Sequence, residues 1–379
     1  MQQPQQRPKG PRPIGKEIPK ALMPYKPNYT NWVIAGLVIV AVVAIFVFFS
    51  QLPQSPPVNP TPAVSIAATP EPTKLSTPTP IPTPTPTDEP MPTIVFREIS
   101  KCGPVSKDIV LENDLESKGT CFVVGAQGIT IDCSGHRITG KEEENSSAVY
   151  SEFEGTSIKN CNISKFEVGV RLKNADSSSV VESIFSENRG GMLVQTSKGL
   201  LIKGNQFFNN PVGGLILNSV DGSEILDNFA DGSKKYGIQL VTSDMNTLKG
   251  NQIYRNTYGL QISGSRGNLI EGNNVSFNTA GIKITSRSMD NVLKGNQVNG
   301  NRGVGLHVLD WSSAVISGNT FNGNEYGINV LDTFNIIDNN IVCENSISDF
   351  YCEFAQNATG NACLQRSTVC GFDCERRCP

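Results

Sequence analysis

Two aspartates in this sequence, Asp310 and Asp332, are well placed for acid–base chemistry because each follows the same repeated segment. Trp311 comes directly after the first of them. If consecutive repeats stack at the strand spacing of about 4.8 Å, the two carboxyl groups approach the separation of about 5 Å that retaining glycosidases use. One carboxyl would then supply a general acid. The alternatives are that both aspartates cap turns while Trp311 covers apolar surface, or that Trp311 stacks on a sugar ring.

A row of outward-pointing side chains is expected beside this pair, two residues after each repeat glycine. Along the chain the row reads Arg171, Leu193, Ile216, Gln239, Gln261, Lys283, His307 and Asn329. Its later members are polar, so they predict an exposed ladder that hydrogen-bonds a ligand. The candidate catalytic residues are Asp310, Asp332, His307 and Lys283. The candidate ligand-binding residues are Trp311, Gln239, Gln261 and Asn329.

A repeat of about 22 residues must position these side chains. Its signature is a glycine, an apolar residue, any residue and a second apolar residue, recurring every 22 to 24 positions. The glycines are Gly169, Gly191, Gly214, Gly237, Gly259, Gly281, Gly305 and Gly327. About fourteen residues later comes an asparagine: Asn205, Asn228, Asn251, Asn273, Asn296, Asn319 and, slightly early, Asn339. Such regular periodicity indicates a repeat architecture.

The pattern inside each unit predicts short strands, since apolar and polar residues alternate and Gly, Asn and Ser separate the segments. No apolar run has helical spacing, the frame of a leucine-rich repeat is missing, and a β-sandwich would not keep a constant unit length. We therefore predict an all-β fold, a right-handed single-stranded parallel β-helix of about ten coils. The asparagines stack at a turn and stabilise the coils. Lys249, Glu271 and Lys294 face one another on the outside.

The first 93 residues have a different composition, since they hold 21 of the 24 prolines and none of the ten cysteines. Residues 32–52 are uncharged and apolar, and at about 1.5 Å per helical residue they are long enough to cross a bilayer once. Six of the seven charged residues before them are basic, which predicts a cytoplasmic N-terminus. A cleaved signal peptide is the alternative. The Thr-Pro pairs of residues 53–93 predict an extended stalk.

The cysteines indicate an oxidising compartment outside the membrane, where disulfides persist. We expect four of them to stabilise the first coils and six to hold a cap over the last coil, with the pairing left open. They are Cys102, Cys121, Cys133, Cys161, Cys343, Cys352, Cys363, Cys370, Cys374 and Cys378. A metal site at the last three is the alternative, but their spacing is not that of a zinc knuckle, and the chain has only two histidines. We predict no metal and no cofactor.

The predicted organisation is a basic Pro-rich cytoplasmic tail at 1–31, a transmembrane helix at 32–52, a stalk at 53–93, a β-helix at 94–345 and a Cys-rich cap at 346–379. The net charge is −3 and no basic stripe occurs. Because phosphate binding needs clustered cations, this composition argues against nucleic acid as a partner.

The chain resembles the pectate-lyase-like right-handed β-helix superfamily, and within it the NosD-type and CASH (carbohydrate-binding and sugar-hydrolase) repeat proteins. The resemblance spans about residues 100–365. Besides the repeat, it rests on an opening Cys102-Gly-Pro-Val, on Gly119-Thr-Cys-Phe, and on a closing Ser348-Asp-Phe-Tyr-Cys352. These segments are similar to those of β-helix proteins predicted on archaeal cell surfaces. The resemblance implies a carbohydrate-related or surface-structural role.

The copper ligands and catalytic motifs known from members of these families have no matching residues in this sequence. The copper link of NosD-type proteins is not expected here, because Met192, Met245, Met289 and His307 lie in different units. The paired-aspartate motifs of polygalacturonases are missing. His136 is expected to lie in the first coil with no carboxylate near it, so we expect it to be a turn residue.

The expected function is therefore recognition of carbohydrate or of the cell envelope by a membrane-anchored extracellular β-helix, which also has a structural role at the surface. The expected partner is a polysaccharide or a glycosylated component of the cell envelope. A polysaccharide lyase or glycoside hydrolase acting on a surface polysaccharide is one alternative. An adhesin is the other.

Overall fold

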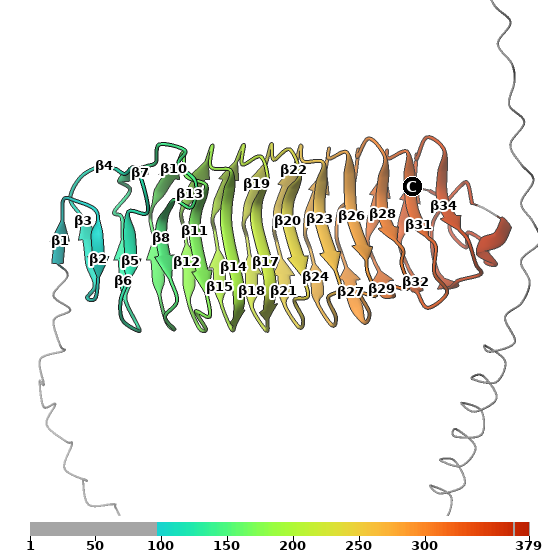
Figure 1. Ribbon diagram of the computed structural model, residues 1–379. Coiled ribbons are helices and arrows are strands. Elements are labelled where there is room, and N and C mark those ends of the chain that lie inside the picture. The colour runs from blue at the N-terminus through green and yellow to red at the C-terminus, as the bar shows by residue number, and fades with distance from the viewer. Residues whose placement is uncertain (1–96, 367, 379) are drawn as a thin grey trace, which may run out of the picture. The chain divides into compact units, whose positions relative to one another are not determined.

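The computed structural model describes residues 97–366 and 368–378, and these residues form a parallel β-helix. Figure 1 shows the coils following one another along a single axis. One face of the helix holds 12 strands, so there are about 12 coils rather than the ten predicted. The difference arises because the coils before Gly169 and the last coil lack the repeat glycine. The predicted all-β fold is confirmed.

The strands form three long faces. The 13-stranded sheet, here called sheet A, contains β1 (Arg97–Ile99), β3 (Ile109–Leu111), β6 (Thr130–Asp132), β9 (Ser157–Lys159), β12 (Ser179–Val181), β15 (Leu201–Lys203), β18 (Glu224–Leu226), β21 (Thr247–Lys249), β24 (Leu269–Glu271), β27 (Asn291–Lys294), β29 (Ala314–Ser317), β32 (Ile336–Asp338) and β35 (Asn357–Thr359). The 12-stranded sheet B contains β2 (Gly103–Val105), β5 (Phe122–Val124), β8 (Ser147–Ser151), β11 (Val168–Lys173), β14 (Gly190–Lys198), β17 (Gly213–Asp221), β20 (Tyr236–Val241), β23 (Tyr258–Ser263), β26 (Ala280–Thr285), β28 (Val304–Val308), β31 (Tyr326–Val330) and β34 (Ser348–Cys352).

The third face, sheet C, has eight strands followed by two more. They are β4 (Leu115–Glu116), β7 (Arg137–Thr139), β10 (Asn162–Ser164), β13 (Ile184–Ser186), β16 (Gln206–Phe208), β19 (Phe229–Asp231), β22 (Gln252–Tyr254) and β25 (Asn274–Ser276), then β30 (Thr320–Asn322) and β33 (Ile341–Cys343). Single parallel bridges through Gln297 join β25 to β30. The face is therefore continuous along the helix.

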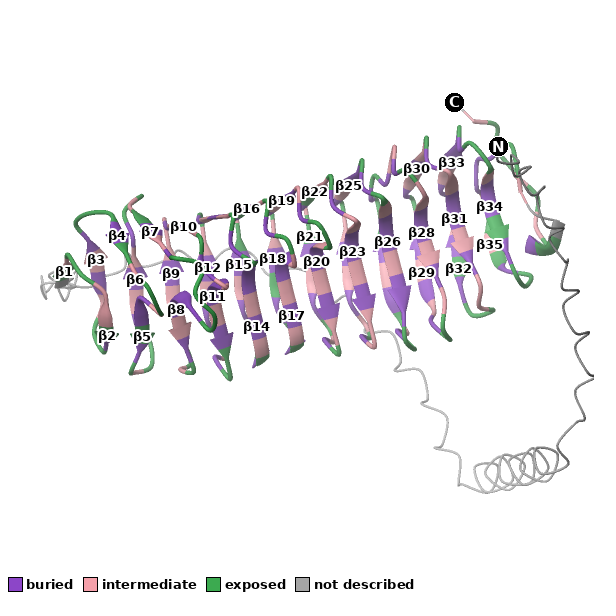
Figure 2. Ribbon diagram, turned by 45° about the horizontal axis from the view of Figure 1, so that its top comes forward, coloured by how far each residue is buried: buried purple, intermediate pink, exposed green. Residues whose placement is uncertain are grey.

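The core is a set of apolar columns inside the coils. Along each strand of sheet B the side chains alternate between the interior and the surface, which Figure 2 shows as bands of buried and less buried residues. The residues one and three after the repeat glycine have no exposed surface, as predicted: Val170, Leu172, Leu215, Leu217, Ile238, Leu240, Ile282, Ile284, Leu306, Val308, Ile328 and Val330. Phe185 and Phe207 stack on the inner side of sheet C with ring centroids 5.0 Å apart. Each such side chain contributes about 1.5–3 kcal/mol through burial.

Each coil turns at corners where one residue has a left-handed backbone and the next points a polar side chain inward. Gly250 has φ of 68°, and the Asn251 amide behind it has no exposed surface. Asn251 Nδ2 donates to the Ile225 carbonyl of the preceding coil, at 2.8 Å, and to Asn273 Oδ1 of the following coil, at 2.9 Å. Each amide thus links three coils, so the predicted asparagine column is confirmed.

The structure corrects one member of this column. Asn339 is the left-handed residue of its corner, with φ of 56°, and Asn340 supplies the inward amide. Asn319 donates its backbone N–H to Asn340 Oδ1 at 2.9 Å, and Asn340 donates likewise to Asn361 at 2.9 Å. A left-handed asparagine replaces the usual glycine here, since asparagine tolerates that conformation. The two adjacent asparagines make the choice between them ambiguous in the sequence.

The repeat glycine is required by close contact with a second column of amides. A Cβ atom on Gly237 would lie 2.7 Å from Asn256 Nδ2 and 2.4 Å from Ile253 Cγ2. A Cβ atom on Gly259 would meet Asn278 Nδ2 at 2.8 Å. No side chain fits between the start of a sheet B strand and the corner amide packed against it. This close contact therefore explains why each repeat has a glycine at this position.

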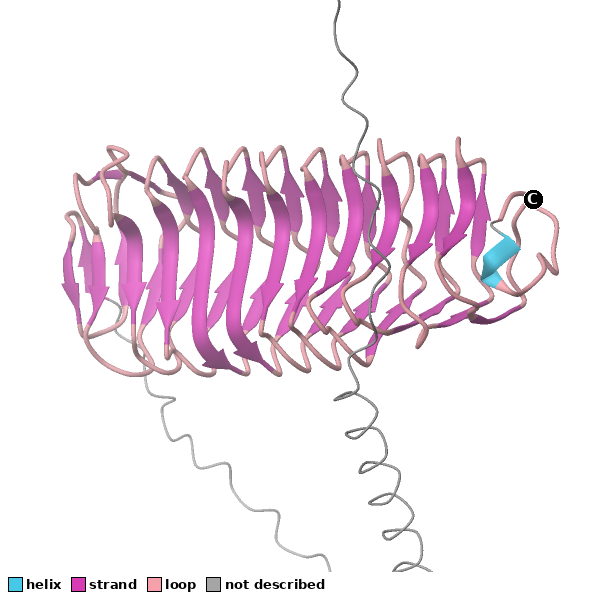
Figure 3. Ribbon diagram, turned by 45° about the vertical axis from the view of Figure 1, so that its right-hand side comes forward, coloured by secondary structure: helices cyan, strands magenta, loops and turns pink. Residues whose placement is uncertain are grey.

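Disulfides hold both ends of the helix, as predicted, and leave no free cysteine. The pairs are Cys102–Cys121, Cys133–Cys161, Cys343–Cys378, Cys352–Cys370 and Cys363–Cys374. Figure 3 shows the C-terminal segment, with the short helix η1 (Thr368–Cys370), at the end of the last coil. The alternative of a metal site at the last cysteines is wrong, because all of them are in disulfides. The first two disulfides stabilise the opening coils.

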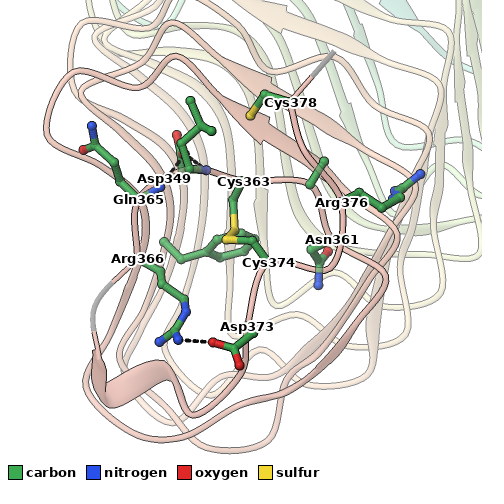
Figure 4. The surroundings of a disulfide bond; sticks show 12 residues. Asp349, Asn361, Cys363, Gln365, Arg366, Asp373, Cys374, Arg376 and Cys378 are labelled. Atoms are coloured by element: carbon green, nitrogen blue, oxygen red, sulfur yellow. Dashed lines mark hydrogen bonds and ion pairs between the residues drawn. A yellow bond between two sulfur atoms is a disulfide. The ribbon is translucent and has the colours of Figure 1, made fainter.

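One buried carboxylate also holds the C-terminal cap in place. Asp349, which is 1% exposed, accepts hydrogen bonds from the backbone N–H groups of Leu364 and Gln365 at 2.7 and 3.0 Å. Its other oxygen accepts from Asn345 Nδ2 at 2.8 Å, so it ends a column of corner amides. Figure 4 shows Asp349 and Gln365 near the Cys363–Cys374 disulfide. The strand edges of the last coil are therefore covered.

Two predictions about the outer surface have different outcomes. Glu271 lies between Lys249 and Lys294, with N–O distances of 3.0 and 3.8 Å, as predicted. The prediction that His136 has no carboxylate near it is wrong, because Asp114 Oδ1 lies 3.3 Å from its Nδ1. Asp114 precedes β4 in the coil before, so only the stacking of coils brings the two together. His136 remains a turn residue at the surface.

The N-terminal tail, the transmembrane segment at 32–52 and the stalk lie outside the described residues. Within 97–366 and 368–378, no helix has the length and apolar character needed to span a bilayer. The anchor and the stalk therefore stay predictions from the sequence.

At one corner a serine with an unpaired hydroxyl replaces the amide, and this corner generates a stability prediction. Ser233 occupies the corner that Asn256 and Asn278 fill in later coils, and its hydroxyl is buried with no hydrogen-bond partner. Ser233→Asn should raise the free energy of unfolding by about 1 kcal/mol, the net value of one hydrogen bond. Chemical denaturation measures this change. Ser233→Ala is the control, expected to be nearly neutral, and a Ser233→Asn variant less stable than Ser233→Ala would contradict the account.

Candidate functional site

Five polar side chains point outward from the middle of consecutive strands of sheet B, and we call them the polar strip. They are Gln239 on β20, Gln261 on β23, Lys283 on β26, His307 on β28 and Asn329 on β31. The strand register pairs each with the next, so they lie one above another. Consecutive members are separated by about one strand spacing, 4.8 Å. The structure thus brings these sequence candidates together on one face.

Three atoms of the polar strip are buried yet lack a hydrogen-bond partner: Gln261 Oε1, His307 Nε2 and Asn329 Oδ1. A buried polar atom left unpaired costs about 1–3 kcal/mol, so such atoms are rare in folded proteins. Within the described residues, the other two such atoms are Asp231 Oδ1 and Ser233 Oγ, whereas the buried corner amides are bonded. Three of the five unpaired atoms thus lie on the polar strip, which makes it a candidate binding surface.

Tyrosines flank the polar strip on the same face. Tyr236 and Tyr258 stack with ring centroids 5.8 Å apart, and the Lys283 ammonium lies 5.6 Å from the centre of the Tyr258 ring. Further along, Tyr326 meets Tyr351 edge to face at 6.0 Å. Tyr351 follows Asn329 in the strand register. The strip therefore has aromatic surface at its side and at its C-terminal end.

The charge state of His307 follows from its surroundings. Burial lowers the pKa of His307 below its ordinary value of 6.5, the charge of Lys283 lowers it further, and Asp310 opposes both effects. The imidazole is therefore neutral at pH 7, with one ring nitrogen that accepts a hydrogen bond. His307 is thus an uncharged member of the strip beside a cationic Lys283.

A cavity of about 440 Å³ lies where the last strands of sheet B end, and we call it the hollow. Trp311 and Phe334 form its exposed apolar walls, being 72% and 78% exposed. Its lining residues are Met289, Leu309, Asp310, Trp311, Leu331, Asp332, Thr333, Phe334, Glu353 and Phe354. Large aromatic side chains are seldom left this exposed, so the hollow is a second candidate for binding.

The two candidate aspartates both line the hollow, and each also has a structural partner. Asp310 Oδ2 accepts a hydrogen bond from the Thr285 hydroxyl at the end of β26. Asp332 Oδ2 accepts one from the backbone N–H of Ser312 at 3.1 Å, continuing the column of corner serines that includes Ser288. The capping role weighed from the sequence is therefore present. It does not remove the carboxylates from the hollow.

Several residues of this surface are missed by sequence reasoning. Phe334, Glu353 and Phe354 come from loops that follow β31 and β34, and they have no fixed place in the repeat. Tyr258 and Tyr326 lie directly before a repeat glycine, at an outward position that was not considered. An apolar side chain at an outward or turn position is the signal that finds them.

Solved structures of other proteins share this fold. A single-residue mutant of the periplasmic alginate epimerase AlgG superposes with a TM-score of 0.56 at 17% identity, covering 68% of this chain and 77% of that one. The A-module of the mannuronan C-5 epimerase AlgE6 from Azotobacter vinelandii gives 0.54 at 11% identity, covering 69% and 92%. Identities this low show a common fold alone. Among curated proteins, no sequence matches this chain at a significant level.

The family model that matches residues 111–302 is described as periplasmic copper-binding protein (NosD), so copper ligands need to be tested. Soft copper ligands are thiolates, thioethers and imidazoles. Every cysteine is in a disulfide, and Met192 is fully buried in the core. His136 contacts Asp114, and within the described residues no group of three or more His, Cys, Asp or Glu side chains is arranged to hold a metal.

Among the described residues these donors form no copper site, and the likeness to the family rests on the fold and the repeat. The match covers about half of the sequence, and it includes the repeat glycines from Gly169 to Gly281. The resemblance stated from the sequence is thus confirmed. The chain belongs to the NosD family of right-handed parallel β-helix proteins.

Proposed function

We propose that this protein displays its β-helix outside the cytoplasm and binds a polysaccharide, or a glycosylated component of the cell envelope, along the polar strip and the hollow. The observation that carries the proposal is the set of buried, unpaired atoms on Gln261, His307 and Asn329. Sugars present many hydroxyl groups, and rotation of these outward side chains would bring the unpaired atoms into hydrogen-bond contact with them. The role is recognition and surface structure.

The aromatic surface supports a sugar ligand in a second way. Pyranose rings have apolar C–H faces, and exposed aromatic rings bind apolar surface while the surrounding polar groups fix its orientation. Trp311 and Phe334 provide such rings beside the carboxylates of Asp310 and Asp332. Tyr258 provides another along the strip. Apolar and polar groups thus alternate over one surface.

The neighbours in fold give weaker support. By their names, AlgG acts on alginate and AlgE6 on mannuronan, and both are polysaccharides. Because one fold hosts many activities, this likeness raises the expectation of a carbohydrate ligand without choosing among ligands. The strip and the hollow, which belong to this chain, give the proposal its main support.

The location belongs to the same proposal. Five disulfides are typical of a protein in an oxidising compartment, and the matching family is described as periplasmic. Residues 32–52 would anchor the protein by one transmembrane helix, with a cytoplasmic N-terminus and residues 53–93 as a stalk. The β-helix would then stand clear of the membrane, where surface polymers reach it. An adhesin for other cells would use the same arrangement with a protein partner.

A hydrolytic or lyase activity is the second candidate, favoured by the carboxylates of Asp310, Asp332 and Glu353 around one hollow. Two carboxyl groups on either side of a glycosidic bond suffice for hydrolysis. Lys283 and His307 are the nearby cation and base of the strip. The hydrogen bonds that hold Asp310 and Asp332 at their corners make this candidate secondary.

Binding is tested with the full chain in detergent and a panel of neutral and acidic polysaccharides, using calorimetry. We expect Gln261→Ala and Trp311→Ala each to weaken binding about tenfold, which corresponds to about 1.4 kcal/mol. Gln252→Ala is the matched control, because Gln252 is an exposed glutamine on sheet C. Unchanged affinity in both strip and hollow variants would rule out this surface.

Catalysis is tested by following the release of new chain ends from the same polysaccharides. Binding without turnover predicts no release above the level of Asp310→Asn and Asp332→Asn variants. Both variants should stay folded, since an amide oxygen still accepts the corner hydrogen bond. Release by the unchanged protein that either variant abolishes would establish the enzyme and displace the binding role.

A further inference from the structure

The unpaired atoms of the polar strip have a chemical bias. The amide oxygens of Gln261 and Asn329 only accept hydrogen bonds. His307 is neutral, because burial and Lys283 lower its pKa, so its ring also offers an acceptor. The NH2 groups of the same amides donate, so each amide both donates and accepts, and a ligand that completes the unpaired oxygens must bring donors.

These groups lie in a fixed order along the helix axis. The register places Gln261, Lys283, His307 and Asn329 on four consecutive coils. Lys283 is the cationic donor of this row, and its ammonium also lies over the Tyr258 ring. A ligand along the row thus meets an amide, an ammonium group, a neutral imidazole and a second amide, separated by about 4.8 Å at each step. Hydroxyl groups suit this order, because each one both donates and accepts.

Three carboxylates of the hollow, against the single positive charge of Lys283 in the strip, disfavour a polyanionic ligand across this surface. The hollow next to the strip contains the carboxylates of Asp310, Asp332 and Glu353. Carboxylate or sulfate groups of a polymer bring acceptors without donors, so they would leave the Gln261 and Asn329 oxygens unpaired and would face like charge in the hollow.

We infer that the polar strip selects neutral polysaccharides with free hydroxyl groups and rejects the same polymers when those hydroxyls are acylated. This inference rests on the proposed function and names its ligand class. An ester removes the hydroxyl proton and adds bulk, so the buried acceptors of Gln261 and Asn329 stay unpaired in the complex. A site built to bond a hydroxyl discriminates strongly against a ligand that lacks it.

The test compares matched ligands on the full chain in detergent. The probes are soluble β-glucan, mannan and galactan, each beside its O-acetylated form, with polygalacturonate as the anionic polymer. At least one neutral polymer should bind, its acetylated form at least tenfold more weakly, and polygalacturonate more weakly than the neutral polymer. Equal binding of the acetylated form, or strongest binding of polygalacturonate, would overturn the inference and leave the proposed function standing. Binding of no polymer would overturn both.

A double variant assigns the selectivity to the strip. Gln261→Met with Asn329→Leu replaces the unpaired amides by apolar side chains of similar size, so its melting temperature should equal or exceed that of the unchanged protein. Its preference for the hydroxylated polymer over the acetylated one should fall at least threefold. An unchanged preference in this folded variant would mean that the selectivity arises elsewhere, and the inference would fail.

Discussion

Hydrogen bonding by buried side-chain amides at the corners of the coils is the interaction on which the rest of this structure depends. A chain that turns sharply several times per coil leaves backbone N–H and C=O groups without strand partners inside the protein. Asn251 and the amides above and below it satisfy these groups and join successive coils. They fix the strand register, and the register in turn places every outward side chain.

Side chains that point into the coils provide stability, whereas side chains that point outward are free to serve function. Inward positions hold the aliphatic columns and the amides, where a polar or larger substitution would be costly. Outward positions of sheet B are unconstrained by the core, so the polar strip can differ from the apolar Leu193 and Ile216 of earlier coils. A common fold can thus carry copper-related, carbohydrate-related or structural roles in different members. The described residues of this chain form no copper site, and carbohydrate binding is the role that we propose for it.

The sequence predicts what repeats, and misses what does not. The glycine signature, the inner columns and the strip follow from a period that the register obeys along the whole chain. From the sequence, the column position belongs to Asn339 instead of Asn340, because the two asparagines are adjacent. The contact between Asp114 and His136 is missed because it depends on the stacking of two coils that lack the repeat glycine. Phe334 and Glu353 come from loops without periodicity, so only three-dimensional structure places them in the hollow.

The central claim is that the unpaired atoms of the polar strip are completed by a glycan. A crystal structure of the protein with a bound oligosaccharide tests it most directly. The account predicts sugar hydroxyl oxygens within hydrogen-bond distance of Gln261 Oε1 and Asn329 Oδ1, with a sugar ring against an aromatic side chain such as Trp311. A sugar bound on sheet A or sheet C, with the strip left open to solvent, would contradict it.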